Sequence, residues 1–335
     1  MPREIQKKTI AVLRGGKEDY YRSMKSGANI ILSLSRYPEE VDVIDVAIDE
    51  DENWFEKGIP SDAHRVFSQA DYYVDLTKDY SGSHHNLSKK LNIKQILEND
   101  FHRVLSRVNV RRILDQLGYE TPKYVVFRDD KNLENNLKTL WAKFHTPVVI
   151  KEGDNTKNSK SLLTYSFIEA YKKIKEIVAR GGEAIVEEHL EGEYVSIAAI
   201  PNYRGEDLYV STPIETMYLS STPRVVQGRT IKDKYLIDHD HHKKSLTHMD
   251  QSFKKKLKEI IGELHSSLSL EHHVMLDLCL KKKDGNYNIK ILELHTNPQL
   301  YDDSRFDFIL KNSGVDMGKF IIDRIDILEE GDKIY

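Results

Sequence analysis

The sequence has almost no cysteine. Among its 335 residues Cys279 is the single one, so the chain cannot close an internal disulfide or build a zinc site from several thiolates. A chain without disulfides is typical of a reducing compartment, so we expect a cytoplasmic protein. The histidine pairs, such as those at 84–85 and 241–242, follow no zinc-ligand spacing.

Long hydrophobic runs and an excess of one charge are also missing. No stretch approaches the roughly 18–20 apolar residues that cross a membrane, and the apolar run near the N-terminus is too short for a secretory signal. Lysine and arginine number 50 against 54 aspartates and glutamates, a formal net charge of −4. A balanced charge gives no broad basic field, so we expect neither a membrane nor a nucleic acid as partner.

The common glycine-rich nucleotide motifs are absent too. Gly15 and Gly16 follow an apolar run, but the G-x-G-x-x-G spacing of a dinucleotide site is not there. The polar loop Thr156–Ser161 contains no P-loop pattern, so the sequence does not support a Walker-type NTPase.

Enough apolar material is present for a sizeable core. Hydrophobic residues make up 39% and charged residues 31% of the sequence. From its length we expect two or three domains. The first 100 or so residues contain three apolar runs that read as strands, one just before Gly15, one at 41–48 and one at 72–76. A helical pattern at 20–34 separates the first two. This alternation predicts a doubly wound parallel sheet, an α/β domain.

The remaining chain has a mixed pattern. The next part of the chain is predicted to be an α+β unit. Its expected strands lie at 124–127, 147–151, 162–165 and 184–188, and its expected helices at 104–117, 133–143 and 167–179. Further on, the sequence predicts strands at 195–200 and 208–212 and helices at 253–268 and 320–328. An Asp-Gly turn at 284–285 predicts a hairpin of strands 274–280 and 287–294. The segment between Thr222 and His248 is poorly periodic and is expected to be a loop.

This hairpin carries the strongest chemical signal. Glu293 and His295 are two apart on one strand and therefore share a face, and the hairpin brings Asp277 beside them. Two carboxylates and a third ligand suit Mg²⁺, which prefers oxygen donors and bridges to nucleotide phosphates. A solvated sheet face with ordinary charges fits the same spacing equally well.

Two further segments could contact a nucleotide. Lys151 closes a very apolar strand, where its ammonium could meet a phosphate, although a surface lysine with a buried stem is the alternative. Another apolar strand ends in the polar stretch Glu187, Glu188, His189 and Leu190. This stretch could hold an adenine; the alternative is a strand that ends in solvent.

Taken in order along the chain, these motifs make the sequence resemble the ATP-grasp superfamily, and most closely the D-alanine–D-alanine ligase family. Residues 292–298, Leu-Glu-Leu-His-Thr-Asn-Pro, are similar to the family's E-x-N-T-x-P-G box. Ser304 falls where the family has a serine near its substrate, and Lys234-Tyr235 resembles the family's loop over the phosphates. The opening strand with its glycine pair also matches.

The resemblance implies an ATP-grasp fold with three parts. These are an N-terminal doubly wound (pre-ATP-grasp) domain at 1–105, a central subdomain at 106–190 and a C-terminal subdomain with the metal site at 191–335. It also implies a ligase: ATP phosphorylates a carboxylate, and an amine attacks the acylphosphate to form an amide. The implied cofactors are ATP and Mg²⁺, with Mn²⁺ possible, and the implied substrates are small amino acids or peptides. Family members are often dimers, so a homodimer is a possible state.

Individual roles follow from the same resemblance. The metal would be held by Asp277, Glu293 and His295. Phosphates would meet Arg107, Lys151 and Lys234. Adenine and ribose would meet Glu187, Glu188, Leu190 and Glu193, with Tyr194 an alternative to Glu193. Lys234 and Ser304 would take part in catalysis.

Several positions depart from the family pattern. His295 replaces an asparagine, Gln299 a glycine, and Met275 an arginine that would stabilise the tetrahedral intermediate. The losses fall mainly on positions that serve the D-alanine substrates, whereas nucleotide and metal positions are kept or substituted by similar chemistry. The sequence therefore predicts a divergent ligase with altered amino-acid or peptide specificity. The alternative is a catalytically impaired nucleotide-binding or regulatory protein.

Overall fold

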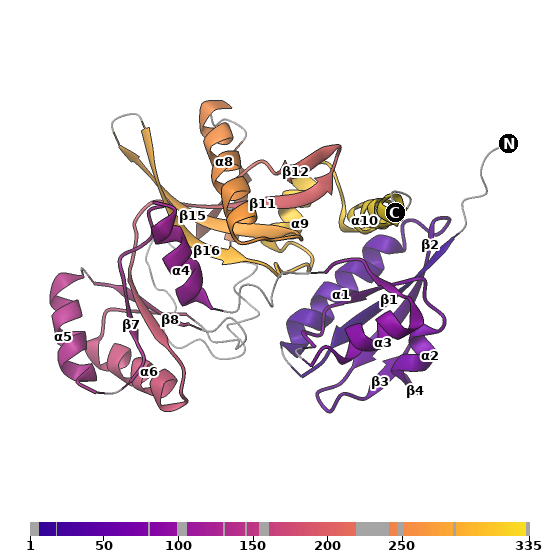
Figure 1. Ribbon diagram of the computed structural model, residues 1–335, viewed down its shortest axis with the longest axis horizontal. Helices are drawn as coiled ribbons and strands as arrows, with labels where there is room; N and C mark the ends of the chain where they lie inside the picture. The colour runs from indigo at the N-terminus through magenta and orange to yellow at the C-terminus, as the bar shows by residue number, and fades with distance from the viewer. Residues whose placement is uncertain are drawn as a thin grey trace.

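The computed structural model describes residues 7–17, 19–79, 81–98, 106–129, 131–144, 146–153, 161–218, 241–246, 251–283 and 286–332. It contains three sheets, each with its own helices, arranged as three lobes (Figure 1). The mixture of a mainly parallel sheet and two antiparallel sheets confirms the expected α/β and α+β classes. Lys234 and residues 156–160 of the polar loop Thr156–Ser161 lie outside the described residues.

The N-terminal sheet has the strand order β4-β3-β2-β1-β5-β6. Strands β1, β2, β5 and β6 are parallel, and β3 and β4 add an antiparallel edge. The elements of this lobe are β1 (Lys8–Gly15), α1 (Tyr20–Leu34), β2 (Val41–Ile48), β3 (Trp54–Glu56), β4 (Ile59–Ser61), α2 (Ala63–Phe67), β5 (Tyr72–Asp75), α3 (Ser83–Leu91) and β6 (Lys94–Gln95).

Strand β1 is apolar throughout because both of its faces are covered. Ile10 and Val12 point into a core shared with α1, whereas Ala11 and Leu13 point into a second core with α2 and α3. The strand ends at the predicted glycine pair, whose φ angles are positive, 95° at Gly15 and 83° at Gly16. Glycine suits this turn because a side chain is strained in that region.

The central lobe is a four-stranded antiparallel sheet in the order β7-β10-β8-β9. Alternate residues of its strands pack against α5 and α6 in one apolar core, and the opposite face carries Lys151 and Glu187. Its elements, with the helix that precedes it, are α4 (Arg107–Gln116), β7 (Tyr124–Phe127), α5 (Leu133–Lys143), β8 (Val148–Glu152), β9 (Leu162–Thr164), α6 (Phe167–Ala179) and β10 (Ala184–Glu188).

The C-terminal sheet has the order β14-β13-β11-β15-β16, with β12 also paired to β11. One face packs against α8 and α4, and the other against α9 and α10. Its elements are β11 (Glu193–Tyr203), β12 (Glu206–Val210), β13 (Ile214–Tyr218), β14 (His241–Ser245), α8 (Gln251–Ser267), β15 (Val274–Lys283), β16 (Asn286–His295), α9 (Arg305–Asn312) and α10 (Met317–Asp332).

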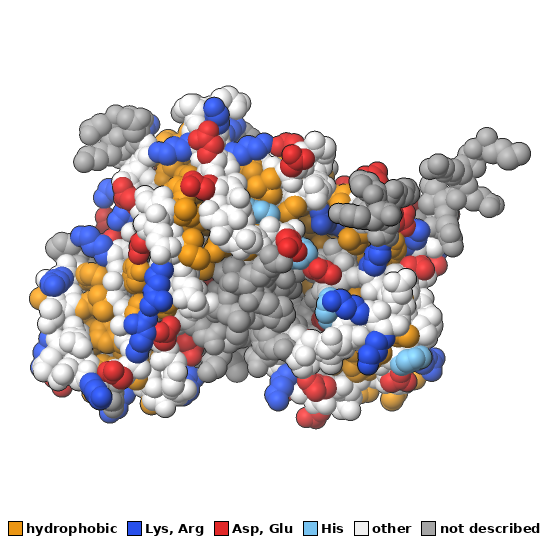
Figure 2. All heavy atoms as spheres, in the orientation of Figure 1, with side chains coloured by type: hydrophobic (Ala, Val, Ile, Leu, Met, Phe, Trp, Pro, Cys, Tyr) orange, Lys and Arg blue, Asp and Glu red, His pale blue; other side chains and the backbone are white. Residues whose placement is uncertain are grey.

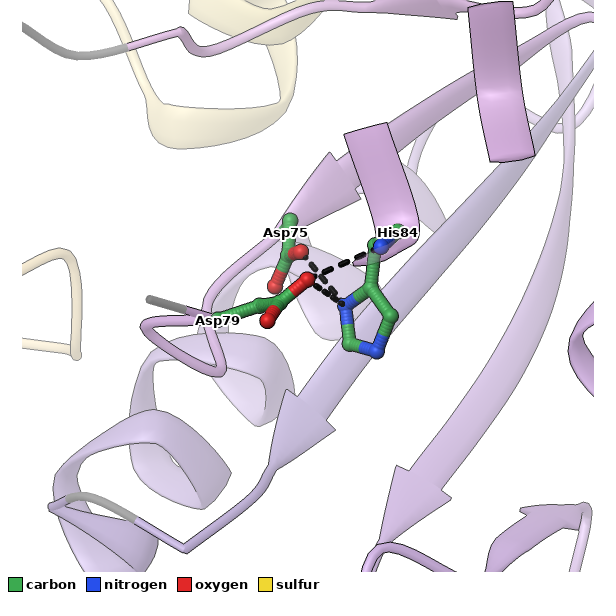
Figure 3. A group of neighbouring side chains, drawn as sticks. All are labelled: Asp75, Asp79 and His84. Carbon is green, nitrogen blue, oxygen red and sulfur yellow. Dashed lines mark hydrogen bonds and ion pairs between the residues drawn. The ribbon is translucent and has the colours of Figure 1, made fainter. Parts of the chain in front are cut away.

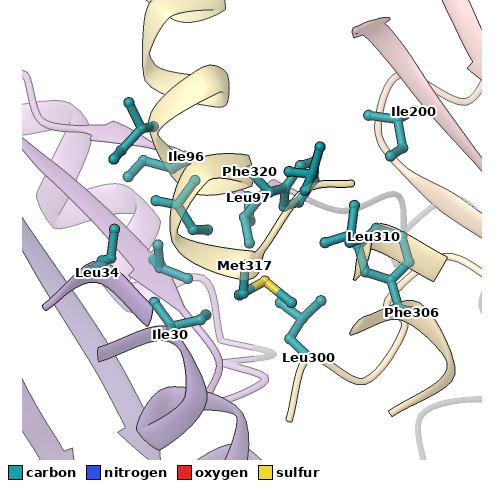
Figure 4. Close-up of a cluster of buried hydrophobic side chains, with 14 of the residues drawn as sticks. Ile30, Leu34, Ile96, Leu97, Ile200, Leu300, Phe306, Leu310, Met317 and Phe320 are labelled. Atoms are coloured by element: carbon teal, nitrogen blue, oxygen red, sulfur yellow. The ribbon is translucent and has the colours of Figure 1, made fainter. Parts of the chain in front are cut away.

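The last helix, α10, joins the N-terminal and C-terminal lobes. Figure 4 shows Met317 and Phe320 of α10 among side chains from both, including Ile30 and Leu34 of α1 and Phe306 of α9. The helices approach closely at Gly318, where a Cβ would lie 2.5 Å from the carbonyl oxygen of Ser33. This shared core fixes α9, and with it the end of the C-terminal sheet, against the first lobe.

Some elements were not expected from the sequence. The loop prediction is wrong at His241–Ser245, which forms β14, while 219–240 lie outside the described residues. Its sequence, HHKKS, has no apolar alternation, and its place in the sheet depends on backbone pairing with β13 at a sheet edge. The short elements β3, β4, α2, α3, β6, β13 and α9 were likewise not predicted.

Charged side chains of both signs are interspersed over the face shown in Figure 2, as the balanced composition leads one to expect. None of the helices in the described part of the chain is long and apolar enough to cross a bilayer.

Candidate functional site

Four of the predicted nucleotide and metal residues meet where the central and C-terminal sheets face each other around α4 (Figure 1): Arg107, Lys151, Glu187 and Glu293. Helix α4 contributes two arginines, β8 and β10 contribute a lysine and a glutamate, and β16 contributes Glu293. These elements are separated by up to 186 positions in the sequence. The site is therefore assembled by the fold and cannot be read from any single motif.

Glu187 lies at the centre of a buried ion-pair network. The Arg111 guanidinium donates to Glu187 Oε1 through Nη2 at 2.5 Å and Nε at 3.1 Å, and Lys151 Nζ lies 2.9 Å from Oε2. Side-chain exposure is 3% for Glu187 and 5% for Arg111. Arg111 also donates to the carbonyls of Ile291 and Leu292 on β16, so it ties the two sheets together.

Glu293 is held by cations from the central lobe. Arg107 donates to Glu293 Oε1 through Nε at 3.0 Å and Nη2 at 2.9 Å, and Lys151 Nζ lies 3.8 Å from Oε2. Burial acts to raise the pKa of Glu293, but the charges of Arg107 and Lys151 outweigh it and hold the pKa well below its usual range. The carboxylate is thus fixed in its ionised form.

Asp277 is the register partner of Glu293, as the hairpin predicts, with a bulge directly after Asp277. Its Oδ1 accepts from Ser196 Oγ at 2.6 Å, and its Oδ2 faces His295 Nε2 at 2.7 Å and Arg305 Nη1 at 2.5 Å. Burial acts to raise the pKa of Asp277, but Arg305 and His295 outweigh it and keep the pKa far below its usual range.

The donor chemistry of this hairpin fits a divalent ion. Asp277 and Glu293 offer ionised carboxylates on one face of the sheet, which suits Mg²⁺, and the imidazole of His295 beside Asp277 also suits Mn²⁺. Yet these three residues do not form a group whose donor atoms all lie within 4.8 Å of one another. A single ion touching all three would require these side chains to move closer together.

The predicted adenine segment, residues 187–190, starts within the end of β10 and continues just beyond it. Glu188 accepts from the backbone N–H of Lys123 and from Lys290, both at 3.0 Å. The Tyr194 hydroxyl donates to the carbonyl of Leu190 at 2.7 Å, and Glu193 is exposed. Their proposed contacts with adenine and ribose stay predictions.

Ser304 serves locally as the N-cap of α9. Its Oγ donates to the carbonyl of Gln299 at 2.8 Å and accepts from the N–H of Asp307 at 3.2 Å, and the residue is 3% exposed. In this structure the hydroxyl therefore fixes the start of α9, and its contact with a substrate remains a prediction.

Three site residues were not identified from the sequence: Arg111, Ser196 and Arg305. Arg111 gave a usable signal, since an arginine on the buried face of an amphipathic helix needs an acidic partner. Ser196 and Arg305 gave none, because their contact with Asp277 depends on the register of β11 with β15 and on the packing of α9.

A second polar group lies in the N-terminal lobe (Figure 3). Asp75, Asp79 and His84 are the one described group of three metal-ligand side chains whose donor atoms all lie within 4.8 Å of one another. His84 Nδ1 lies 2.8 Å from Asp75 Oδ2, and Asp79 accepts the N–H of His84 at the start of α3. Burial acts to lower the pKa of His84, but the hydrogen bond and charge of Asp75 raise it overall.

A family model and a set of solved structures match this chain. The family model described as D-ala D-ala ligase C-terminus matches residues 113–326, nearly two thirds of the chain. No curated protein sequence matches. Among solved structures, the D-alanyl-alanine synthetase A of Vibrio cholerae superposes with a TM-score of 0.75 at 16% identity, over 96% of this chain and 98% of that one.

Two further structures have the same fold. The VanG D-Ala:D-Ser ligase of Enterococcus faecalis gives a TM-score of 0.66 at 17% identity, covering 96% of this chain and 99% of that one. The D-alanine–D-alanine ligase of Bacillus anthracis, solved with ATP, gives 0.65 at 14% identity, covering 95% and 96%. The fold is therefore the ATP-grasp fold, and the chain belongs to the D-alanine–D-alanine ligase family as a divergent member.

Proposed function

We propose that this protein is an ATP-dependent carboxylate–amine ligase that forms an amide bond through an acylphosphate, with an amino-acid or peptide specificity of its own. The observation that carries the proposal is the meeting of Arg107, Lys151 and Arg111 with Glu187 and Glu293 between the two sheets. A site of this composition can bind phosphate oxygens through its cations and present carboxylates to a divalent ion at the same place.

The cations would bind and orient the nucleotide. Lys151 is 11% exposed and is fixed between Glu187 and Glu293, so its ammonium is directed by the fold and loses little freedom on meeting a phosphate. Phosphoryl transfer depends mainly on positioning and on stabilising the charge that spreads over the transferred group. Bound Mg²⁺ would supply part of that stabilisation, with Asp277, Glu293 and His295 as its proposed ligands.

Amide formation requires a second step. The amine nitrogen forms the new C–N bond and the carbonyl electron pair moves to oxygen. When that pair returns, the bond to phosphate breaks, and the nitrogen's proton passes to solvent. We assign Lys234 to the transferred phosphate and Ser304 to the substrate side by resemblance.

Altered specificity is supported by the positions that depart from the family pattern. Met275 is 3% exposed and packs in the apolar core with Phe306, so no guanidinium stands at that place. The second substrate also differs among proteins of this fold, as the name D-Ala:D-Ser ligase of the Enterococcus faecalis structure states for that protein.

The test is a screen for ATP-dependent condensation. The protein is incubated with ATP, MgCl₂ and pairs from a panel of D- and L-amino acids and dipeptides. Phosphate release is followed, and mass spectrometry detects products equal to two substrates minus water. Lys151→Met should lower amine-stimulated release at least about tenfold. Lys138→Met, which removes an exposed pair with Glu134, should not.

One observation favours a second candidate, a nucleotide-binding protein without ligase activity. Asp277, Glu293 and His295 are not gathered into one close donor group, and arginines hold both carboxylates. Binding of ATP with no phosphate release under any amine, and no condensed product, would favour this candidate and overturn the ligase proposal.

A further inference from the structure

Arg305 is a cation beside Asp277 to which neither the motifs nor the comparisons give a role. Its Nη1 lies 2.5 Å from Asp277 Oδ2 and 3.2 Å from Ser196 Oγ, and about a third of its side chain, 34%, is exposed. It reaches this place from the first turn of α9, across the same sheet face that carries Asp277 and Glu293.

The start of α9 is rigidly fixed. Ser304 caps the helix, and the carboxylate of Asp307, 1% exposed, accepts from Asn29 Nδ2 at 3.2 Å and from the N–H of Asp303 at 2.9 Å. Lys311 completes the arrangement at 2.7 Å from Asp307. Because these groups are held by buried bonds, the fold itself sets the position of Arg305 over the hairpin.

Strand β15 supplies no arginine beside Asp277. Met275 lies two residues before Asp277 and therefore on the same face, but its side chain is buried in the apolar core that includes Phe306 and Ile309. The guanidinium next to Asp277 comes from α9 instead.

The contacts of Asp277 imply competition between Arg305 and a metal ion. Ser196 occupies Oδ1, whereas His295 and Arg305 both meet Oδ2. A divalent ion that used Asp277 as a ligand would have to share or displace these partners. Ligands about 2.1 Å from one octahedral Mg²⁺ lie about 3 Å from their neighbours, so a phosphate oxygen on that ion would be within reach of the displaced guanidinium.

We propose that Arg305 is a phosphate-binding residue of the nucleotide site that exchanges partners, holding Asp277 until a metal–nucleotide complex binds and then binding a triphosphate oxygen. The proposal rests on the proposed function for the identity of the nucleotide. Arg305 would then have two opposite effects. It opposes the binding of a metal ion alone and favours the binding of the metal–triphosphate complex.

Arg305→Met tests both effects without any turnover. Binding of Mn²⁺ alone is measured by electron paramagnetic resonance, and binding of AMP-PNP with Mg²⁺ by calorimetry. The variant should bind Mn²⁺ alone about tenfold more tightly and the magnesium complex of AMP-PNP about tenfold more weakly. Arg305→Lys should fall between, since an ammonium keeps the charge and loses the planar fork. Arg128→Met, which removes an arginine–glutamate pair of the central lobe, is the matched control and should change neither affinity.

The outcomes separate this proposal from the ligase proposal. Changes of the same sign, or no change, in both affinities overturn the role of Arg305, since loss of folding would weaken both. Opposite changes in a protein that joins no amino acids support Arg305 and overturn only the ligase activity. A wild-type protein that binds neither probe overturns both.

Discussion

Asp277 and Glu293 face each other in register on β15 and β16, and an arginine from a different helix holds each carboxylate. Arg107 reaches Glu293 from α4, which packs beside the central lobe, and Arg305 reaches Asp277 from α9, which packs against α10. The two proposed metal ligands are thus tied to two different neighbours of the C-terminal sheet.

The buried pair of Arg111 and Glu187 should be costly to break. Arg111→Met leaves the Glu187 carboxylate, which is 3% exposed, with Lys151 as its remaining ion-pair partner among the described residues. It should lower the free energy of unfolding by about 3 kcal/mol. Adding Glu187→Gln should recover part of this loss, because the uncompensated charge is gone. Urea unfolding of the two single variants and the double variant measures the coupling, and strictly additive losses would contradict it.

The close approach of α10 to α1 should be intolerant of a side chain. Gly318→Ala would place a Cβ 2.5 Å from the carbonyl oxygen of Ser33, so it should destabilise the protein by about 1–3 kcal/mol. Gly262→Ala in α8 is the matched control, because its nearest neighbour would be 3.9 Å away. The free energy of unfolding of that variant should rise by about 0.5–1 kcal/mol, because alanine favours a helix more than glycine does. Equal effects of the two substitutions in denaturant unfolding would show that the approach is not tight.

His84 should make stability depend on pH. Its pKa is raised in the folded protein by Asp75 despite burial, so the stabilisation is fully present below the ordinary value of about 6.5 and is lost as pH rises through the raised value. The loss in unfolding free energy caused by His84→Gln should therefore be larger at pH 6 than at pH 9.

The control is His64→Gln, which changes an exposed histidine of α2. Its effect measures the cost of the histidine-to-glutamine change at a site without that carboxylate pair. A His84→Gln effect that is the same at both pH values, or larger at pH 9, would refute the pairing of His84 with Asp75.

Much of the fold could be predicted from local sequence, because long elements have a clear period. The predicted limits match the structure for α1, β2, β7, α5, α6 and β10. Short or polar elements such as β14 and α3 could not be predicted, since pairing and packing at a distance determine them. The pairing of Asp277 with Glu293 could be predicted from the sequence, because the two-residue period and the Asp-Gly turn signal both favoured a hairpin, and the strands are paired as expected.

The partners of these carboxylates could not be predicted in the same way. Arg107, Arg111 and Arg305 come from helices far away in the sequence, and nothing in their local pattern specifies which carboxylate they meet. The resemblance identified the family, which the family model confirms over residues 113–326. It did not provide Arg305, because that contact depends on how α9 packs across the sheet.

The most direct test of the proposed ligase is amide formation by the wild-type protein and by Asp277→Asn, with ATP and Mg²⁺ over the amino-acid and dipeptide panel. Asparagine keeps the size of the side chain and one acceptor oxygen, which can face Arg305 while the amide NH2 donates to Ser196 Oγ. The fold should therefore be retained, as circular dichroism would check. We predict that the wild type releases phosphate in equal amount to a condensed product, and that Asp277→Asn lowers this rate at least about a hundredfold. Equal rates of product formation by the two proteins, or no product from the wild type with any pair, would contradict the account.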